Sequence, residues 1–349
     1  MSNSETTTPS GPSPMTEPLL RLEDVEQVFS TKQGQVPAVG GVNLQVHKGR
    51  VLCLVGESGC GKTTTARAAA GLAKPTDGVV SFRGQDINRL TRAERFGYRR
   101  AVQYIHQDPY ASLNPTRTVH SSLTAGIRKN KLVASKSAAK QKAIELLELV
   151  DLTPAESYLE KYPHQLSGGQ RQRVNVARSL AMNPELLICD ESTSMLDVSI
   201  RVSILNTLGK LRDDLGVGFM FITHDLAVAK YFAWDGEIAV MYLGKVVEQG
   251  PTPQIINDPQ HPYTKALIAA VSEPDPDMAQ KVDATAGLRS AEIPSLTNLP
   301  GGCTFHPRCP LFEAGNCDSS EPSLVPLEGR RRLACHVVAR DHMQAKAVG

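Results

Sequence analysis

The chain has 349 residues, of which 41% are hydrophobic and 21% are charged, an ordinary globular composition that allows a sizeable core. Its net charge of +2 at pH 7 implies no strong attraction to nucleic acid, and residues 330–332 form the one local basic cluster. No apolar run reaches the roughly 18 residues that a membrane-spanning helix needs. We therefore expect a globular protein with no nucleic acid partner.

The first 18 residues are rich in Ser, Thr and Pro and have neither a basic start nor an apolar stretch. This composition predicts a disordered tail and is unlike that of a secretory signal. We therefore expect the protein to stay in the cytosol, where structural disulfides are rare.

Strand and helix patterns follow one another over residues 19–250. Alternating apolar and polar residues predict short antiparallel strands over 19–46. Continuous apolar runs predict buried strands at 51–55, 186–189 and 219–223. Helix patterns occur at 62–72, in much of 109–163, at 167–181 and at about 200–215. The alternation favours an α/β fold with an inserted helical subdomain at about 108–178.

A glycine-rich phosphate-binding pattern, G-x-x-x-x-G-K-[ST], lies between a predicted buried strand and a predicted helix. With the threonine that follows, this phosphate loop consists of Gly56, Glu57, Ser58, Gly59, Cys60, Gly61, Lys62, Thr63 and Thr64. Its glycines let backbone N–H groups turn inward around phosphate oxygens, and the helix N-terminus adds a favourable dipole. We expect Lys62 to reach the β- and γ-phosphates and the Thr63 hydroxyl to bind Mg²⁺.

Two acids, Asp190 and Glu191, follow the buried strand at 186–189, at the end where α/β sheets bind ligands. Asp190 suits the Mg²⁺ shell, and Glu191 is placed to act as the general base on the attacking water. A strand ending in Asp-Glu is more often a surface turn, but the phosphate loop favours the functional interpretation.

A second glycine-rich turn follows about a hundred residues after the first, and it consists of Leu166, Ser167, Gly168, Gly169 and Gln170. Ser167 is a good helix N-cap, and the two glycines leave the N–H groups of the first helical turn uncovered. This is an anion site without a cation of its own. Because the main phosphate site lies elsewhere, the turn needs another purpose.

The order of these motifs, from Leu19 to about Gly250, resembles that of the ATP-binding cassette (ABC) ATPases. The resemblance implies a P-loop NTPase core of the RecA-like type, with an antiparallel β subdomain and an inserted helical subdomain. It implies that residues 166–170 are the signature that closes on the ATP of a second subunit. Gln107 resembles the glutamine that touches Mg²⁺ and the water, and His224 resembles the switch histidine at the γ-phosphate.

Two further features complete the resemblance to the ABC ATPases. Phe29 stands where the family stacks an aromatic ring on adenine. The loop that crosses the dimer interface in that family is matched by Ser194, Met195, Leu196 and Asp197, although small residues are usual at the position of Met195.

Proline becomes frequent beyond Gly250, so we expect a domain boundary there and a small C-terminal extension over 251–349. Three segments resemble the ATPases that serve oligopeptide, dipeptide and nickel importers: His261–Leu267, Asp108–Pro115 and Gly302–Pro310. The resemblance therefore implies that the transported substrate is a peptide or nickel.

Four of the seven cysteines, Cys303, Cys309, Cys317 and Cys335, crowd one stretch of the extension. Four cytosolic thiols in a proline-rich, poorly apolar segment suggest a metal, and a tetrathiolate site suits Zn²⁺ or an iron–sulfur cluster. The spacing lacks the C-x₂-C pairs usual for structural zinc. The resemblance to peptide-permease ATPases favours a [4Fe–4S] cluster, with Zn²⁺ as the alternative.

The resemblance as a whole implies the ATP-hydrolysing subunit of an oligopeptide- or dipeptide-type ABC importer, peripheral at the cytoplasmic face of the inner or plasma membrane. Its expected partners are a second ABC ATPase subunit, identical or paralogous, in a head-to-tail dimer, two transmembrane permease subunits and, indirectly, an extracytoplasmic solute-binding protein. The alternatives are an importer ATPase for nickel or another small solute, and a soluble ABC ATPase of iron–sulfur assembly, repair or translation. A redox-sensing role of the extension is compatible with the first interpretation.

Overall fold

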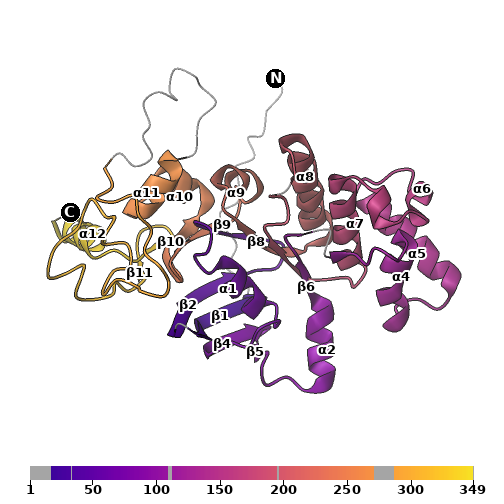
Figure 1. Ribbon diagram of the computed structural model, residues 1–349, viewed down its shortest axis with the longest axis horizontal. Coiled ribbons are helices and arrows are strands. Elements are labelled where there is room, and N and C mark those ends of the chain that lie inside the picture. The colour runs from indigo at the N-terminus through magenta and orange to yellow at the C-terminus, as the bar shows by residue number, and fades with distance from the viewer. Residues whose placement is uncertain (1–16, 33, 109–111, 195, 271–286, 349) are drawn as a thin grey trace, which may run out of the picture.

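Two β-sheets form the centre of the protein (Figure 1). The computed structural model describes residues 17–32, 34–108, 112–194, 196–270 and 287–348. The smaller sheet is antiparallel, in the order β2-β1-β4-β5, and its strands are β1 (Leu20–Thr31), β2 (Gly34–Val46), β4 (Asp77–Phe82) and β5 (Gln85–Asp86). Residues 20–46 thus form two long strands instead of several short ones, because bulges in β1 between Leu22 and Val28 absorb the irregular alternation.

The larger sheet has eight strands in the order β11-β12-β10-β9-β3-β8-β7-β6. Five neighbours are parallel: β9 (Glu237–Tyr242), β3 (Val51–Val55), β8 (Gly218–Thr223), β7 (Leu186–Asp190) and β6 (Val102–Ile105). Every residue of β3, β7 and β8 is buried, as their continuous apolar runs predict. The parallel arrangement brings the carboxyl ends of β3, β6, β7 and β8 to one edge.

Helix α1 (Lys62–Ala69) packs against β1 and β2 of the smaller sheet and against β7 and β8 of the larger one. Ala66 and Ala69 of α1 are buried in the same core as Val42 of β2 and Leu54 of β3. The small alanine side chains let the helix lie close to both sheets, so its N-terminus is held at the carboxyl edge of the parallel strands.

A group of helices lies at one end of the molecule (Figure 1), and it consists of α4 (Val119–Lys129), α5 (Lys136–Leu149), α6 (Glu156–Leu159) and α7 (Gly168–Leu180). The hydroxyls of Thr118, Ser135 and Ser167 cap α4, α5 and α7 by accepting bonds from backbone N–H groups. Helix α2 (Arg92–Ala101) leads into β6, and a 3₁₀ turn at Pro163–Gln165 precedes α7.

Helices α8 (Val198–Leu215) and α9 (Leu226–Phe232) connect the parallel strands, and Asp197 and Asp225 cap them. The remaining elements are β10 (Lys245–Pro251), α10 (Thr252–Asn257), α11 (Pro262–Ala269), β11 (Val325–Pro326), β12 (Arg332–Leu333) and α12 (His336–Val348).

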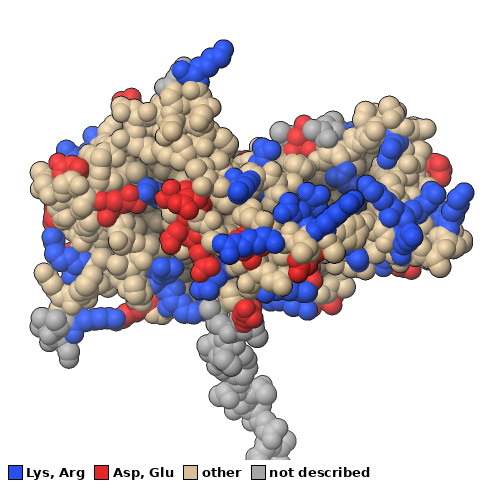
Figure 2. All heavy atoms as spheres, turned by 90° about the horizontal axis from the view of Figure 1, so that it is seen from below, with Lys and Arg blue, Asp and Glu red and all other residues tan. Residues whose placement is uncertain are grey.

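In the described part of the chain, no helix is both long and apolar enough to cross a membrane. Figure 2 shows side chains of both charge signs on the face that it draws.

The C-terminal extension continues the larger sheet. The boundary expected at Gly250 falls within β10, and β12 pairs with β10 so that Glu248 lies opposite Leu333. Tyr263 and Phe305, both almost fully buried, belong to the same core as Val55 of β3. The extension therefore shares a sheet and a core with the segment that precedes it.

Candidate active site

The phosphate loop follows β3 and is shaped by glycines with positive φ. Gly56 has φ 155°, and a Cβ there would lie 2.1 Å from the carbonyl oxygen of Met241. Gly61, with φ 105°, is the N-cap of α1, and no side chain caps this helix. The first N–H groups of α1 therefore remain open to an anion, as expected for a phosphate site.

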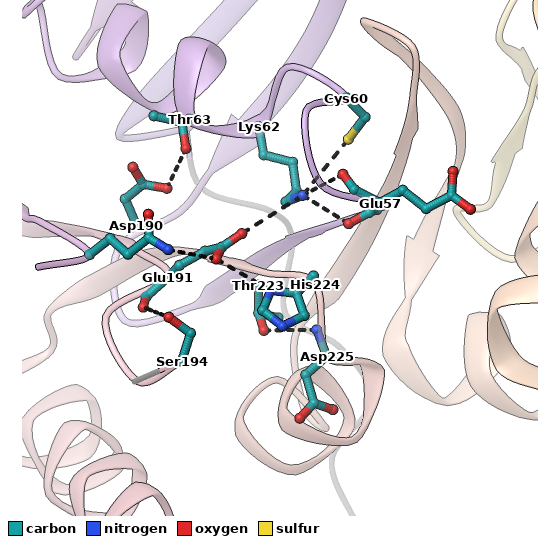
Figure 3. A network of polar contacts seen from close by, with 12 residues as sticks. Glu57, Cys60, Lys62, Thr63, Asp190, Glu191, Ser194, Thr223, His224 and Asp225 are labelled. Carbon is teal, nitrogen blue, oxygen red and sulfur yellow. Dashed lines mark hydrogen bonds and ion pairs between the residues drawn. The ribbon is translucent and has the colours of Figure 1, made fainter. Parts of the chain in front are cut away.

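Lys62 lies in the centre of the site, between the phosphate loop and β7 (Figure 3). Its Nζ donates to the carbonyl oxygens of Gly56 and Glu57, each at 2.8 Å, and lies 4.0 Å from Oε1 of Glu191. The side chain is almost fully buried. Its positive charge is thus held between the loop and the predicted general base.

Thr63 and Asp190, the two expected Mg²⁺ ligands, are in direct contact. The Thr63 hydroxyl donates to Oδ1 of Asp190 at 2.9 Å. The Tyr104 hydroxyl, which the sequence did not reveal, donates to Oδ2 of Asp190 at 2.6 Å. Burial raises the pKa of Tyr104, and the Asp190 charge raises it further, so the phenol keeps its proton and remains a donor. Tyr104 therefore fixes the carboxylate while Thr63 approaches it from α1.

Gln107 and His224 lie beside the same carboxylate oxygen of Glu191. Nε2 of Gln107 donates to its Oε2 at 3.1 Å, and Nδ1 of His224 lies 3.3 Å from the same atom. Glu191 has φ 45°, in the left-handed region that a non-glycine residue rarely adopts. Such strain is common at functional sites.

The signature turn is capped by its own residues. Oγ of Ser167 accepts from the Gln170 N–H at 3.2 Å, and Oε1 of Gln170 accepts from the Ser167 N–H at 3.1 Å. A Cβ on Gly169 would lie 2.5 Å from Cγ2 of Ile200, so the glycine lets α7 approach α8 closely. The guanidinium of Arg171 donates to two carbonyl oxygens of the preceding turn, which fixes the start of α7.

Within the chain the two glycine-rich turns have different neighbours. Helix α7 packs against α4, α5, α8 and β6, whereas α1 packs against the two sheets. The N-terminus of α7 is therefore built separately from the phosphate loop, and its binding to the ATP of a second subunit stays a prediction.

The structure also places three other predicted site residues, Phe29, Cys60 and Ser194. Phe29 stands on β1 with 45% of its surface exposed. Cys60 in the phosphate loop is buried, and burial raises the pKa of its thiol. Oγ of Ser194 donates to the carbonyl oxygen of Glu191 at 2.9 Å. Met195 lies outside the described residues, as do Pro109–Ala111 of the segment after Gln107.

The four cysteines of the extension are brought near one another. The Cys303 N–H donates to the carbonyl oxygen of Cys317 at 2.8 Å. The pKa of Cys303 is raised to about 11 and that of Cys309 to about 12, mainly by burial and in part by the charges of the neighbouring cysteines. The described residues nevertheless contain no group of three or more Cys, His, Asp or Glu arranged to hold a metal ion. The arrangement therefore gives the predicted zinc or iron–sulfur site no direct support.

Comparison with known proteins agrees with this geometry. A family model described as ABC transporter matches residues 39–194, and one described as the C-terminal region of oligopeptide/dipeptide transporters matches residues 247–317. A putative oligopeptide transport ATP-binding protein of Bacillus subtilis, YkfD, is 41% identical over 321 residues, which cover 92% of this chain and 95% of that protein. The chain belongs to the ATP-binding proteins of ABC transporters. It is thus an ABC ATPase, with the P-loop fold expected from its motifs.

A second relative and a solved structure are also similar to this chain. The oligopeptide transport ATP-binding protein OppF of Salmonella typhimurium is 40% identical, with 88% of this chain and 92% of that protein covered. The ATP-binding cassette MJ0796, in a dimeric post-hydrolysis structure bound to ADP and Pi, is 29% identical with a TM-score of 0.60. That alignment covers 67% of this chain and 98% of MJ0796. The cassette fold therefore occupies about two thirds of the chain.

Proposed function

We propose that the chain is the ATP-hydrolysing subunit of an ABC importer for oligopeptides or dipeptides. The observation that carries this proposal is the match of residues 247–317 to the C-terminal region of oligopeptide/dipeptide transporters. Relatives named as oligopeptide and dipeptide transport ATP-binding proteins align with about nine tenths of the chain. The cassette accounts for ATP hydrolysis, and the extension narrows the substrate class.

Thr63, Asp190 and Gln107 are the residues that would hold Mg²⁺. The Thr63 hydroxyl and the Asp190 carboxylate already touch at 2.9 Å, and both offer the oxygen donors that Mg²⁺ prefers, so this pair fits the ion. When bound, Mg²⁺ neutralises charge on the phosphates. Tyr104 holds the carboxylate of Asp190 in position for this role.

ATP hydrolysis uses the side chains at the carboxyl edge of the parallel strands. Glu191 accepts a proton from the attacking water, and Gln107 and His224 hold its carboxylate in position through Oε2. Lys62 supplies positive charge to the β- and γ-phosphates, and the exposed ring of Phe29 offers a stacking face for adenine.

A second ATPase subunit, identical or paralogous, completes each site. The N-terminus of α7, at Ser167–Gln170, binds the γ-phosphate held by the partner's phosphate loop in a head-to-tail dimer. Two transmembrane permease subunits dock near Gln107 at the cytoplasmic face of the membrane, and an extracytoplasmic binding protein delivers the solute. ATP binding closes the dimer, and hydrolysis reopens it.

Uptake measurements in the source organism test the proposed substrate. We expect deletion of the gene to abolish uptake of a radiolabelled tripeptide or dipeptide, and the intact gene, carrying an affinity tag, to restore it. Affinity purification from solubilised membranes should then recover permease subunits with the chain. Unchanged peptide uptake together with lost nickel uptake would overturn the peptide assignment. Recovery of the chain without membrane proteins would contradict the importer itself.

We further propose that Cys303, Cys309, Cys317 and Cys335 hold a [4Fe–4S] cluster, with Zn²⁺ as the alternative. The resemblance to peptide-permease ATPases supports this proposal; in the structure, the Cys303 N–H donates to the carbonyl oxygen of Cys317 at 2.8 Å, and Cys317 and Cys335 belong to one hydrophobic cluster. With pKa values raised to about 11 and 12, Cys303 and Cys309 must lose protons when they bind metal.

Anaerobic purification of the full chain tests the cluster. We expect iron and acid-labile sulfide in equal amounts, and we expect Cys309→Ser to lose most of both. Cys53→Ala is the matched control, because Cys53 is a buried cysteine of β3 and not one of the four cysteines of the extension. Protein with neither iron nor zinc, or an equal metal content in the Cys309→Ser variant, would contradict the proposal.

A further inference from the structure

The C-terminal extension touches the phosphate loop at Glu57. Nη1 of Arg308 lies 3.3 Å from Oε1 and 3.2 Å from Oε2 of Glu57. Arg308 is 7% exposed, and its guanidinium lies 5.8 Å from the ring centroids of both Tyr242 and Phe305. A buried arginine needs a partner for its charge, so the position of this side chain and that of the Glu57 carboxylate depend on each other.

A second contact from the extension reaches the backbone of the same residue. The hydroxyl of Tyr263 accepts the Glu57 N–H at 3.0 Å. The Tyr263 ring is 1% exposed and lies 4.6 Å from the ring of Tyr242 and 5.5 Å from that of Phe305. Because this aromatic group packs in the main core, the hydroxyl is a fixed acceptor.

The start of α11 is itself anchored to the larger sheet. Glu248 of β10 is fully buried, and its carboxylate accepts from the backbone N–H groups of Gln260 and His261. Nδ1 of His261 accepts the Tyr263 N–H at 3.0 Å, and burial lowers the pKa of His261 to about 3, so the ring stays neutral at physiological pH. The His-Pro-Tyr segment thus holds Tyr263 against the phosphate loop.

Glu57 is consequently held at three points. Its N–H is bonded to Tyr263, its carboxylate is bonded to Arg308, and its carbonyl oxygen accepts from Lys62 at 2.8 Å. Two of these three partners belong to the extension. The peptide that orients Lys62 is therefore fixed by residues that lie 206 and 251 positions away in the chain.

We propose that Arg308 and Tyr263 are positioning residues for the phosphate loop, and that through Glu57 the extension sets the affinity of the site for ATP. They act before hydrolysis, by holding the loop in its binding geometry, and they make no contact with the catalytic carboxylate of Glu191. The proposal requires ATP binding by this cassette and is independent of the transported solute.

Steady-state kinetics with MgATP, on the full chain, tests this role. Arg308→Gln removes the charge of the pair, and we expect KM to rise about tenfold while kcat changes by less than about twofold. Tyr263→Phe keeps the packed ring and removes only the acceptor, and we expect KM to rise about fivefold. Unchanged KM values in both variants would overturn the proposal.

Arg331→Gln is the matched control for general loss of stability. Arg331 is also a buried arginine of the extension, 8% exposed, but it pairs with Asp258 at 3.2 Å and with the carbonyl oxygen of Gln254. We expect this variant to keep the KM for MgATP of the unaltered chain. A rise equal to that of Arg308→Gln would show that any disturbance of the extension weakens binding, which would remove the specific role of Arg308.

A double-mutant cycle separates the pair from its surroundings. Glu57→Gln should itself raise KM, and Arg308→Gln added to it should raise KM no further, because the shared interaction is already lost. Independent, multiplying effects would contradict the coupling. If Arg308→Gln does not fold, Tyr263→Phe decides alone, since it removes a single oxygen and leaves the aromatic packing in place.

Discussion

Replacement of Glu191 by Gln is expected to abolish ATP turnover and to leave ATP bound. The amide keeps the shape of the side chain and can still accept from Gln107, but it cannot take a proton from water. Loss of a general base typically lowers kcat by about 10²–10⁴-fold. Single-turnover hydrolysis measured beside nucleotide binding checks this result, and sedimentation should reveal an ATP-dependent dimer that no longer dissociates.

Glu185→Gln is a suitable control for this experiment. Glu185 precedes β7 at its other end, pairs with Arg83 and lies away from the phosphate loop. We expect near-normal turnover in this variant, because only a solvent-accessible ion pair is lost. Near-normal turnover in Glu191→Gln would remove Glu191 from the role of base.

Replacement of Gly56 by Ala is expected to eliminate ATP binding by displacing the phosphate loop. The new Cβ would lie 2.1 Å from the carbonyl oxygen of Met241 and 2.9 Å from Sγ of Cys60. Because the backbone of β9 cannot move away easily, the phosphate loop has to move. The strain also destabilises the fold by about 1–3 kcal/mol. Equilibrium binding of MgATP and thermal unfolding measure the two effects.

Gly59→Ala tests whether the clash itself causes the loss. Gly59 has φ 79°, so alanine is strained there as well, but a Cβ would meet no atom within 4 Å. We expect a destabilisation of about 1–2 kcal/mol and a much smaller loss of ATP affinity than in Gly56→Ala. Equal losses of affinity in the two variants would mean that backbone strain, and not the contact with β9, decides the effect.

The parts of the site that depend on local pattern could be predicted from the sequence. The buried strands β3, β7 and β8 are continuous apolar runs, and each is followed directly by residues of the site. Ser167 begins α7 as its capping chemistry predicts. The family order supplied Gln107 and His224, which the fold brings to one carboxylate oxygen of Glu191.

The parts that depend on distant contacts could not be predicted in this way. Tyr104 lies in a four-residue strand, β6, whose mixture of polar and apolar residues gives no clear period. Its contact with Asp190 depends on the parallel pairing of β6 with β7. Arg308 and Tyr263 belong to a segment that the sequence separates from the cassette. Their contacts with Glu57 exist because the extension adds to the same sheet.

The continuity of the larger sheet bears on how such subunits can be recombined. A chimera joined at Gly250 would replace the last residue of β10 and pair this strand with a foreign β12, and the foreign residue at the position of Arg308 would have to pair with Glu57. We therefore expect cassette and extension to be exchanged only as one unit. Related importers that exchange their substrate class should exchange whole ATPase chains. A crossover within the chain should be tolerated only where β10 and β12 come from the same parent.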